Sequence, residues 1–239
     1  ADFLQSVFSS LLWSGFSFVS ALLISSQTPD IPGLQRSDLL LLAAAYGIIV
    51  GMHHWLCNRG FEEVSDIIHR GELDGFLLKP YHTLTLLSLR NVSWGSVPRI
   101  LGSVVLFGIL LHLYNQPVTL FSAIAFAVLS CLSFLLIYGI HTMSCTVLIW
   151  HPYLSNIVYL AQNLIGSARY PLNMRLHVPT FAIALYIPFL FIVNIPVRAL
   201  VGQLALLEFI SFLICSIGVF VFSQWFWRYA LRSYTGASG

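Results

Sequence analysis

The chain has 239 residues, of which 58% are hydrophobic and only 8% are charged. Since about 25% of the residues of an ordinary soluble domain are charged, this composition excludes a water-soluble globule and is typical of a protein whose helices lie in lipid. The net charge is only +2 and the 11 basic residues are scattered, which excludes a clustered nucleic-acid-binding surface.

Apolar stretches long enough to cross a bilayer recur along the chain. A transmembrane helix needs about 20 predominantly apolar residues, so a chain of this length has room for about six crossings. We therefore expect an all-α integral membrane protein with a single transmembrane domain over residues 1–239. The six predicted spans cover residues 3–25, 39–57, 99–114, 118–140, 143–165 and 205–227.

The segment 58–98, between the second and third spans, is unusual because charge collects there. It holds five of the nine acidic residues of the chain. Within it, Phe61, Val64, Ile67 and Ile68 recur at helical spacing, which predicts a short amphipathic helix that ends at Gly71. Such a helix could bind in a groove of a soluble partner through its apolar stripe, and a solvated loop helix without a partner is the alternative.

A further apolar stretch, residues 178–195, is accompanied by Pro179, Pro188 and Pro196. Prolines in that number favour a broken, re-entrant segment over residues 168–200 rather than a span. With both termini cytoplasmic, this topology places seven basic residues inside and four outside. The alternative makes 178–195 a true span and 150–176 cytoplasmic, which changes the count to nine against two.

Polar side chains align on the faces of two predicted spans. Ser10 and Ser14 share a face of the first span, and Asn156, Tyr159 and Asn163 align on the fifth. Because polar side chains in a span usually face protein or a water-filled cavity, we expect these five residues to line a route through the bundle.

Small residues also align on the second span, where Ala43, Gly47 and Gly51 follow one another at four-residue spacing. This pattern lets helices approach closely, either within the chain or at the seam of a dimer. At the end of the same span His53 and Cys57 lie one turn apart. They lack further ligands nearby in the sequence, so no metal site is predicted.

Three motifs carry a resemblance to a known family. Residues 68–80 read IHRGELDGFLLKP and resemble the I-x-x-G-x-L-D-x-x-L-L-[KR]-P signature of ABC-2 type transporter permeases, in the six-span exporter branch. The block from Tyr170-Pro171 through Ile187-Pro188-Phe189 to Pro196 resembles the family's YP, IPF and PA-x-x-LLG pattern, except that Val197 replaces its alanine. The ending 231–239, LRSYTGASG, is similar to the family's R-x-Y-[ST]-[SG]-A-S-G.

The resemblance implies a multi-pass subunit of the plasma (inner) membrane, with both termini cytoplasmic. It would form a dimeric translocation pathway with a second permease copy, identical or sibling, and would bind two ATP-binding cassette ATPase subunits, which hold the ATP and magnesium. No cofactor or metal is expected in this chain, nor any catalysis. The family usually has an amphipathic segment before its first span, so the resemblance also implies residues preceding Ala1.

The resemblance also assigns roles to residues of this chain. Residues 168–200 would form an outer gate that contains Tyr170, Pro171, Pro188 and Pro196. The segment 58–98 would couple the permease to the ATPase. Its coupling residues would be Glu62, Glu63, Asp66, Ile67, Ile68, Gly71, Asp74 and Pro80.

The leading hypothesis is therefore the permease subunit of an ATP-driven exporter. The only lysine, Lys79, has no glycine-rich phosphate loop around it, so ATP would be bound elsewhere. The alternative is a stand-alone secondary transporter coupled to protons through Glu208, the only acid in a predicted crossing, although that side chain could instead make an interhelical hydrogen bond. A membrane-embedded enzyme is disfavoured because the sequence lacks H-E-x-x-H and G-x-S-x-G motifs.

Overall fold

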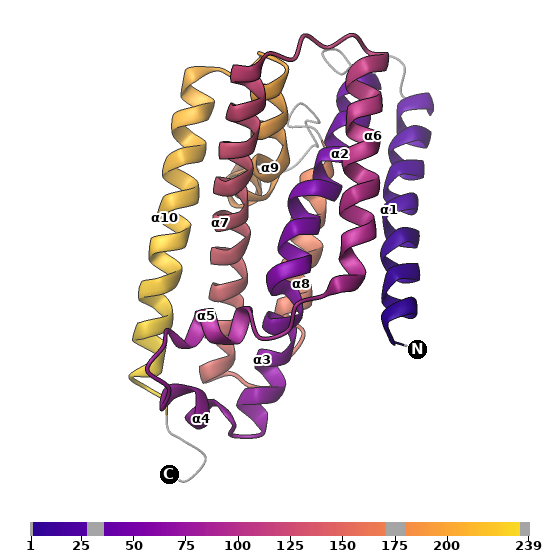
Figure 1. The fold of residues 1–239 in the computed structure, drawn as a ribbon. Coiled ribbons are helices and arrows are strands. Elements are labelled where there is room, and N and C mark those ends of the chain that lie inside the picture. Colours follow the sequence, from indigo (N-terminus) through magenta and orange to yellow (C-terminus); the bar gives the residue numbers. More distant parts are fainter. Residues whose placement is uncertain (1, 28–35, 171–179, 235–239) are drawn as a thin grey trace.

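The computed structural model describes residues 2–27, 36–170 and 180–234, which are helical with no strand (Figure 1). Three short elements connect longer helices: the π-helix η1 (His54–Asn58) and the 3-10 helices η2 (Trp94–Ser96) and η3 (Ser167–Arg169). The α-helices are α1 (Asp2–Gln27), α2 (Arg36–His53), α3 (Arg59–His69), α4 (Leu73–Leu77), α5 (Thr83–Ser88), α6 (Val97–Leu113), α7 (Leu120–Trp150), α8 (Ile157–Gly166), α9 (Thr180–Leu200) and α10 (Leu206–Leu231).

Long apolar helices make up most of the molecule, as expected for a multi-pass membrane protein. Four helical stretches of the described residues are long and apolar enough to cross a bilayer: Ser37–His69, Trp94–Leu113, Leu120–Trp150 and Leu206–Leu231. In addition, α1 has 26 residues and lies lengthwise beside α2 and α6 (Figure 1). At 1.5 Å per residue it is ~39 Å long, against about 30 Å for the hydrocarbon core.

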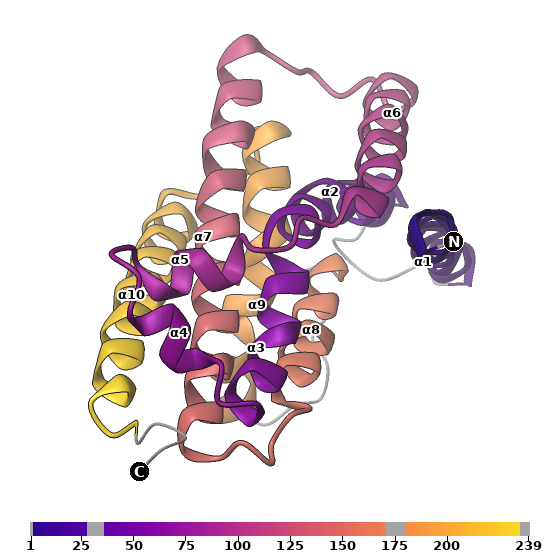
Figure 2. The same cartoon turned by 60° about the horizontal axis from the view of Figure 1, so that its bottom comes forward.

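The short helices α3, α4 and α5 gather at one end of the bundle (Figures 1 and 2). The first turn of α1 and the last turn of α10 lie at this same end, which we call the cap end. The second span and the predicted amphipathic helix are not separated by a loop. Instead α2 continues through η1 into α3, so that Ser37–His69 is one uninterrupted helical rod of 33 residues.

The prediction of separate spans at 118–140 and 143–165 is wrong, because α7 runs unbroken through 31 residues to Trp150. Polar side chains near residue 141 do not interrupt it, since they bond to the preceding turn: His141 Nδ1 donates to the Ile137 carbonyl at 3.0 Å and Thr146 Oγ1 to that of Thr142 at 2.7 Å. The break comes at Pro152, whose preceding residue is forced out of the helical region.

The return across the bundle is shared between α8 and α9. Trp150 at the end of α7 donates its indole N–H to the Ser233 hydroxyl at 2.6 Å, so α7 and α10 both end at the cap end. The chain between them must therefore cross back once. Because α8 has 10 residues, or ~15 Å, it is too short to do this alone. Arg169 follows α8 and lies over the Tyr46 ring within the bundle. Neither predicted topology of residues 141–200 is therefore reproduced: α8 does not complete a span, as the leading topology predicts, and residues 150–176 do not all lie outside the bundle, as the alternative predicts.

The predicted proline-broken segment is also corrected, because Pro188 and Pro196 both lie inside α9. A proline at position 196 cannot donate to the Ile192 carbonyl four residues earlier. Ser133 of α7 supplies the missing donor, since its hydroxyl donates to that carbonyl at 2.6 Å. An unpaired carbonyl costs several kcal/mol in lipid, so this bond explains how α9 continues through its proline.

Small residues on α2 create a close contact with α6. A side chain on Gly47 would collide with Ser103, and one on Gly51 would come within 2.9 Å of Ile100. The reading of Ala43, Gly47 and Gly51 as a packing face within the chain is thereby confirmed for these two glycines.

Ser133→Ala should lower the free energy of unfolding in detergent by about 1–3 kcal/mol, because it leaves the Ile192 carbonyl unpaired. Ser130→Ala is the matched control, since the Ser130 hydroxyl bonds only to Phe126 in its own helix. Adding Pro196→Ala to Ser133→Ala restores a backbone donor and should recover most of the loss in a thermal unfolding assay. If Ser130→Ala and Ser133→Ala have equal effects, the explanation is wrong.

Candidate functional site

The apolar stripe of α3 is buried inside the chain. Phe61, Val64, Ile67 and Ile68 pack in one hydrophobic cluster with residues of α5, α7, α8 and α10. The expectation that this stripe is open to a partner is therefore wrong for the described fold. The stripe packs within the chain because α3 lies at the end of the bundle, where it covers the last turns of α7 and α10.

The side chains of the three acidic residues of α3 point in different directions. The Glu62 carboxylate accepts hydrogen bonds from Asn58 at 2.8 Å and from Gln162 of α8 at 2.9 Å, so it faces inward. Glu63 accepts from Asn91 and lies 3.7 Å from Arg59. Asp66 alone of the three is exposed to solvent.

The turn after α3 has a defined geometry. Gly71 has φ of 68°, the left-handed region, and its N–H donates to the Ile68 carbonyl while the next N–H, of Glu72, donates to that of Ile67. This pair of bonds is the Schellman motif that ends many helices. The half-buried Asp74 lies in the first turn of α4, and the exposed Pro80 lies between α4 and α5.

The C-terminal motif meets this turn. Partial burial and the neighbouring Asp74 carboxylate, which forms a hydrogen bond, raise the pKa of the Tyr234 hydroxyl above its ordinary value. Tyr234 and Leu231 also pack against the cluster that contains the α3 stripe. Two stretches that resemble the same family, one in the middle of the chain and one at its end, are thus neighbours in space. Spacing in the sequence carries no signal for this contact.

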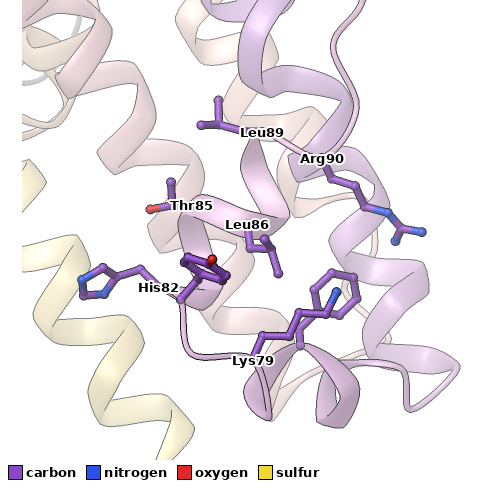
Figure 3. A pocket seen from close by; sticks show the side chains of 8 residues that line it. Lys79, His82, Thr85, Leu86, Leu89 and Arg90 are labelled. Atoms are coloured by element: carbon purple, nitrogen blue, oxygen red, sulfur yellow. The ribbon is translucent and has the colours of Figure 1, made fainter.

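The apolar surface that is exposed at the cap end lies on α4 and α5, and we call it the α4–α5 surface. Leu78 is 87% exposed and Tyr81 is 72% exposed, beside Leu89. A hollow of about 530 Å³ lies between the two helices (Figure 3). Lys79 and Arg90 lie 5.0 and 5.4 Å from the Phe76 ring centroid, which keeps two cations at its rim. The α4–α5 hollow is lined by Phe76, Lys79, Tyr81, His82, Thr85, Leu86, Leu89 and Arg90.

A second hollow, of about 410 Å³, lies among α1, α2, α6 and α8. Of the predicted route residues it contains Ser10 and Asn163, whereas Asn156 and Tyr159 are exposed elsewhere and the Ser14 side chain lies outside the described residues. We call it the polar chamber. Its lining residues are Ser10, Ala43, Tyr46, Gly47, His54, Asn58, Glu62, Ser96, Arg99, Gln162, Asn163, Gly166 and Arg169.

Sequence reasoning missed the two arginines of the polar chamber. Arg99 was placed at the edge of a span and Arg169 outside one, and a charged residue near a span boundary is usually solvated. The structure instead encloses both, with Arg169 over the rings of Tyr46 and Tyr170 at 5.9 and 5.5 Å. The signal that could have identified them is the cost of an arginine inside an apolar segment.

The predicted gate residues lie within the bundle where they are described. The Tyr170 carbonyl accepts a hydrogen bond from Asn194 of α9 at 2.9 Å. Pro196 is buried and Pro188 half-buried, while Pro171 lies outside the described residues. Near the cap end His53 stacks on His141 with ring centroids 4.7 Å apart. In the part of the chain that the structure describes, no three His, Cys, Asp or Glu side chains could hold a metal ion together.

Gly60→Ala should loosen the packing of α3 against α5 at the cap end, because a side chain at this position would collide with the backbone carbonyls of Leu87 and Ser88 in α5. We expect a loss of about 1–3 kcal/mol in unfolding free energy and faster trypsin cleavage after Arg90. Gly75→Ala is the control, since nothing lies near that position. Equal protection of Arg90 in both variants would contradict the proposed contact.

Comparison with known proteins agrees with the motifs. Residues 11–238 match the family described as ABC-2 family transporter protein. Searches of the curated proteins and of the solved structures found no match. The match covers nearly the whole chain, including all the described helices from the middle of α1 onward. The chain is a multi-pass membrane transport component that belongs to the ABC-2 transporter family.

Proposed function

We propose that this chain is the permease subunit of an ATP-binding cassette exporter, which works as a dimer and binds separate ATPase subunits. The ATPase subunits bind ATP and magnesium, and this chain supplies the pathway. The observation that carries the proposal is the α4–α5 surface, which exposes large apolar side chains at an end of the molecule outside the apolar bundle. Exposed apolar groups gathered in this way mark a binding surface.

The α4–α5 surface differs from the one that the motif alone implies. The apolar contact comes from Leu78, Tyr81 and Leu89 rather than from the buried α3 stripe. Lys79 and Arg90 add positive charge beside it. A complementary groove on the ATPase would therefore be apolar with acidic groups at its edge. Of the predicted coupling residues, the exposed Asp66 and Pro80 remain available for contact.

Orientation follows from the charges at the cap end. Six exposed basic side chains lie there: Arg59, Arg70, Lys79, Arg90, Arg228 and Arg232. Positive residues near span ends remain on the cytoplasmic side, so we place the cap and both termini in the cytoplasm. An ATPase that uses cytoplasmic ATP would meet the α4–α5 surface there.

Movement would pass from the cap to the bundle through the rod Ser37–His69. The backbone of Gly60 lies directly against α5, so a push on α5 reaches α3 and then α2 without a flexible loop between them. The π-helix η1 lies in the middle of this path, and π-bulges often mark functional sites in helices. The rod would thus act as a rigid lever with one adaptable turn.

Tyr81→Ala should weaken binding of the ATPase subunit by about thirtyfold or more, since buried tyrosines at interface centres commonly contribute 2 kcal/mol or more. Co-purification of the two subunits from detergent measures the effect. Tyr153→Ala is the matched control, because Tyr153 is 73% exposed in the α7–α8 connection at the cap end. Since Tyr81 is exposed, folding should be unchanged, and full retention of the ATPase by Tyr81→Ala would refute this docking surface.

The alternative of a proton-coupled transporter through Glu208 finds less support. Its carboxylate forms an ion pair with Arg198 and accepts the Ala205 N–H at 3.2 Å, in the first turn of α10. The bond from Arg198 of α9 to Glu208 of α10 is an interhelical hydrogen bond, which was the second role expected for Glu208. Glu208 stabilises the α9–α10 corner, which is at the opposite end from the cap.

Glu208→Gln should therefore lower thermal stability, because it leaves Arg198 without its ion pair, yet leave the pH profile of ATP-dependent transport unchanged. Transport by reconstituted vesicles over a range of pH measures this. A proton gradient that drives transport in the wild type without ATP, and no longer does so in Glu208→Gln, would favour the alternative.

A further inference from the structure

Arg99 is the least satisfied charged group in the described part of the chain. Its Nε and Nη2 atoms are buried and have no hydrogen-bond partner among the residues that the structure describes. The ion pairs found there join Arg59 to Glu63, Arg70 to Glu72 and Arg198 to Glu208, and none involves Arg99.

The groups around Arg99 do not neutralise it. The residues beside it are Tyr46, Gly51 and His54, none of which carries a carboxylate. The one acid of the polar chamber, Glu62, has an oxygen already engaged by Asn58 and Gln162. A buried charge without a partner costs several kcal/mol, so the arrangement calls for an anion that the described residues do not provide.

The unpaired edge of Arg99 has a specific shape. Nε and Nη2 lie on one side of the planar guanidinium and point two N–H groups in parallel. Two oxygens of a carboxylate or a phosphate accept such a pair in a bidentate contact. Water or chloride offers a single acceptor atom that the two N–H groups would have to share, so an oxyanion with two oxygens matches this edge better.

The rest of the polar chamber suits the same ligand. Arg169 contributes a second positive charge, which is held in place over the Tyr46 ring. Asn163 and Ser10 offer polar side chains, whereas Gly47 and Gly166 form small apolar walls. A volume of about 410 Å³ is within the 300–1,000 Å³ typical of small-molecule sites.

We propose that the polar chamber binds an oxyanion, a carboxylate or a phosphate, carried on an apolar body, with Arg99 as its bidentate ligand. The occupant enters among bundle helices, which favours an amphipathic molecule over a free ion. The identification of this molecule as cargo rests on the proposed permease function. Binding itself does not, since it requires neither ATP nor an ATPase subunit.

The test measures binding of decyl phosphate and decanoate to the full chain in a neutral detergent, as the rise of the thermal unfolding midpoint with probe concentration. Decanol and decyltrimethylammonium have the same tail without the anion. We expect the two anions to stabilise the chain and the other two probes to have no comparable effect. Equal stabilisation by decanol or by decyltrimethylammonium would overturn the proposal.

Two variants locate the site. Arg99→Gln should weaken decyl phosphate binding at least tenfold, and Arg99→Lys should be intermediate because it keeps the charge without the planar fork. Gly166→Leu should also block binding, since Gly166 lines the chamber and a Cβ added there would lie 3.9 Å from the Tyr46 hydroxyl, with no Arg99 atom within 4 Å of it. If Arg99→Gln does not fold, the other two variants decide the question.

Two control variants carry the same types of substitution at positions that do not line the polar chamber. Arg228→Gln removes an exposed arginine of α10, and Gly218→Leu adds a side chain where nothing lies near. Both should bind decyl phosphate like the wild type. Wild-type affinity in Arg99→Lys and Gly166→Leu would refute the site, whatever the outcome for Tyr81 at the cap.

The anion could come from a bilayer phospholipid or from a solute, and native mass spectrometry distinguishes them. A phospholipid that stays bound to the wild type through delipidation and is lost from Arg99→Gln identifies the lipid phosphate. Decyl phosphate binding without any retained lipid identifies a solute. A phospholipid retained equally by both proteins, with equal decyl phosphate binding, counts against Arg99.

Discussion

The bond from the Ser133 hydroxyl to the Ile192 carbonyl illustrates the constraint on which this fold depends. Inside a bilayer, each backbone or side-chain polar group must find its partner within the protein. Along the long helix α7, several hydroxyl groups and one histidine nitrogen donate to carbonyls of the preceding turn, as those of Ser130, Thr146 and His141 do. This helix has one hydroxyl in the right place to complete a neighbour as well, and this allows a proline-containing helix to remain a helix in the interior.

The same constraint makes the polar chamber conspicuous. Elsewhere in the described part of the chain, charged groups such as Glu208, which is paired with Arg198, and Lys79, which is exposed at the cap end, have a partner or solvent. In the chamber, the polar side chains converge from helices that are far apart in the sequence, and one guanidinium edge remains open. The rod Ser37–His69 connects the cap end with the polar chamber, because Glu62 belongs to α3 and also lines the chamber.

The sequence was sufficient for the elements that depend on local pattern and insufficient for those that depend on contact. Composition and apolar runs predicted the long helices, and Gly71 predicted the end of α3. The leading topology does not place a break at Pro152 because the apolar run continues on both sides of it, whereas the alternative begins a cytoplasmic segment at residue 150. Pro188 and Pro196 were read as breaks because Ser133, which repairs one of them, lies some sixty residues earlier. Ser10 and Asn163, two of the five predicted route residues, line the same hollow, whereas Arg99 and Arg169 needed the packing of four helices to be recognised.

Lys79 is the only lysine of the chain, and it is exposed at the rim of the α4–α5 hollow, with its ammonium 5.0 Å from the Phe76 ring centroid. A reagent that modifies amines would therefore attach a fluorophore at this one side chain, in addition to the N-terminal amine. The emission of that fluorophore would report when a second subunit covers the surface, without the introduction of a cysteine.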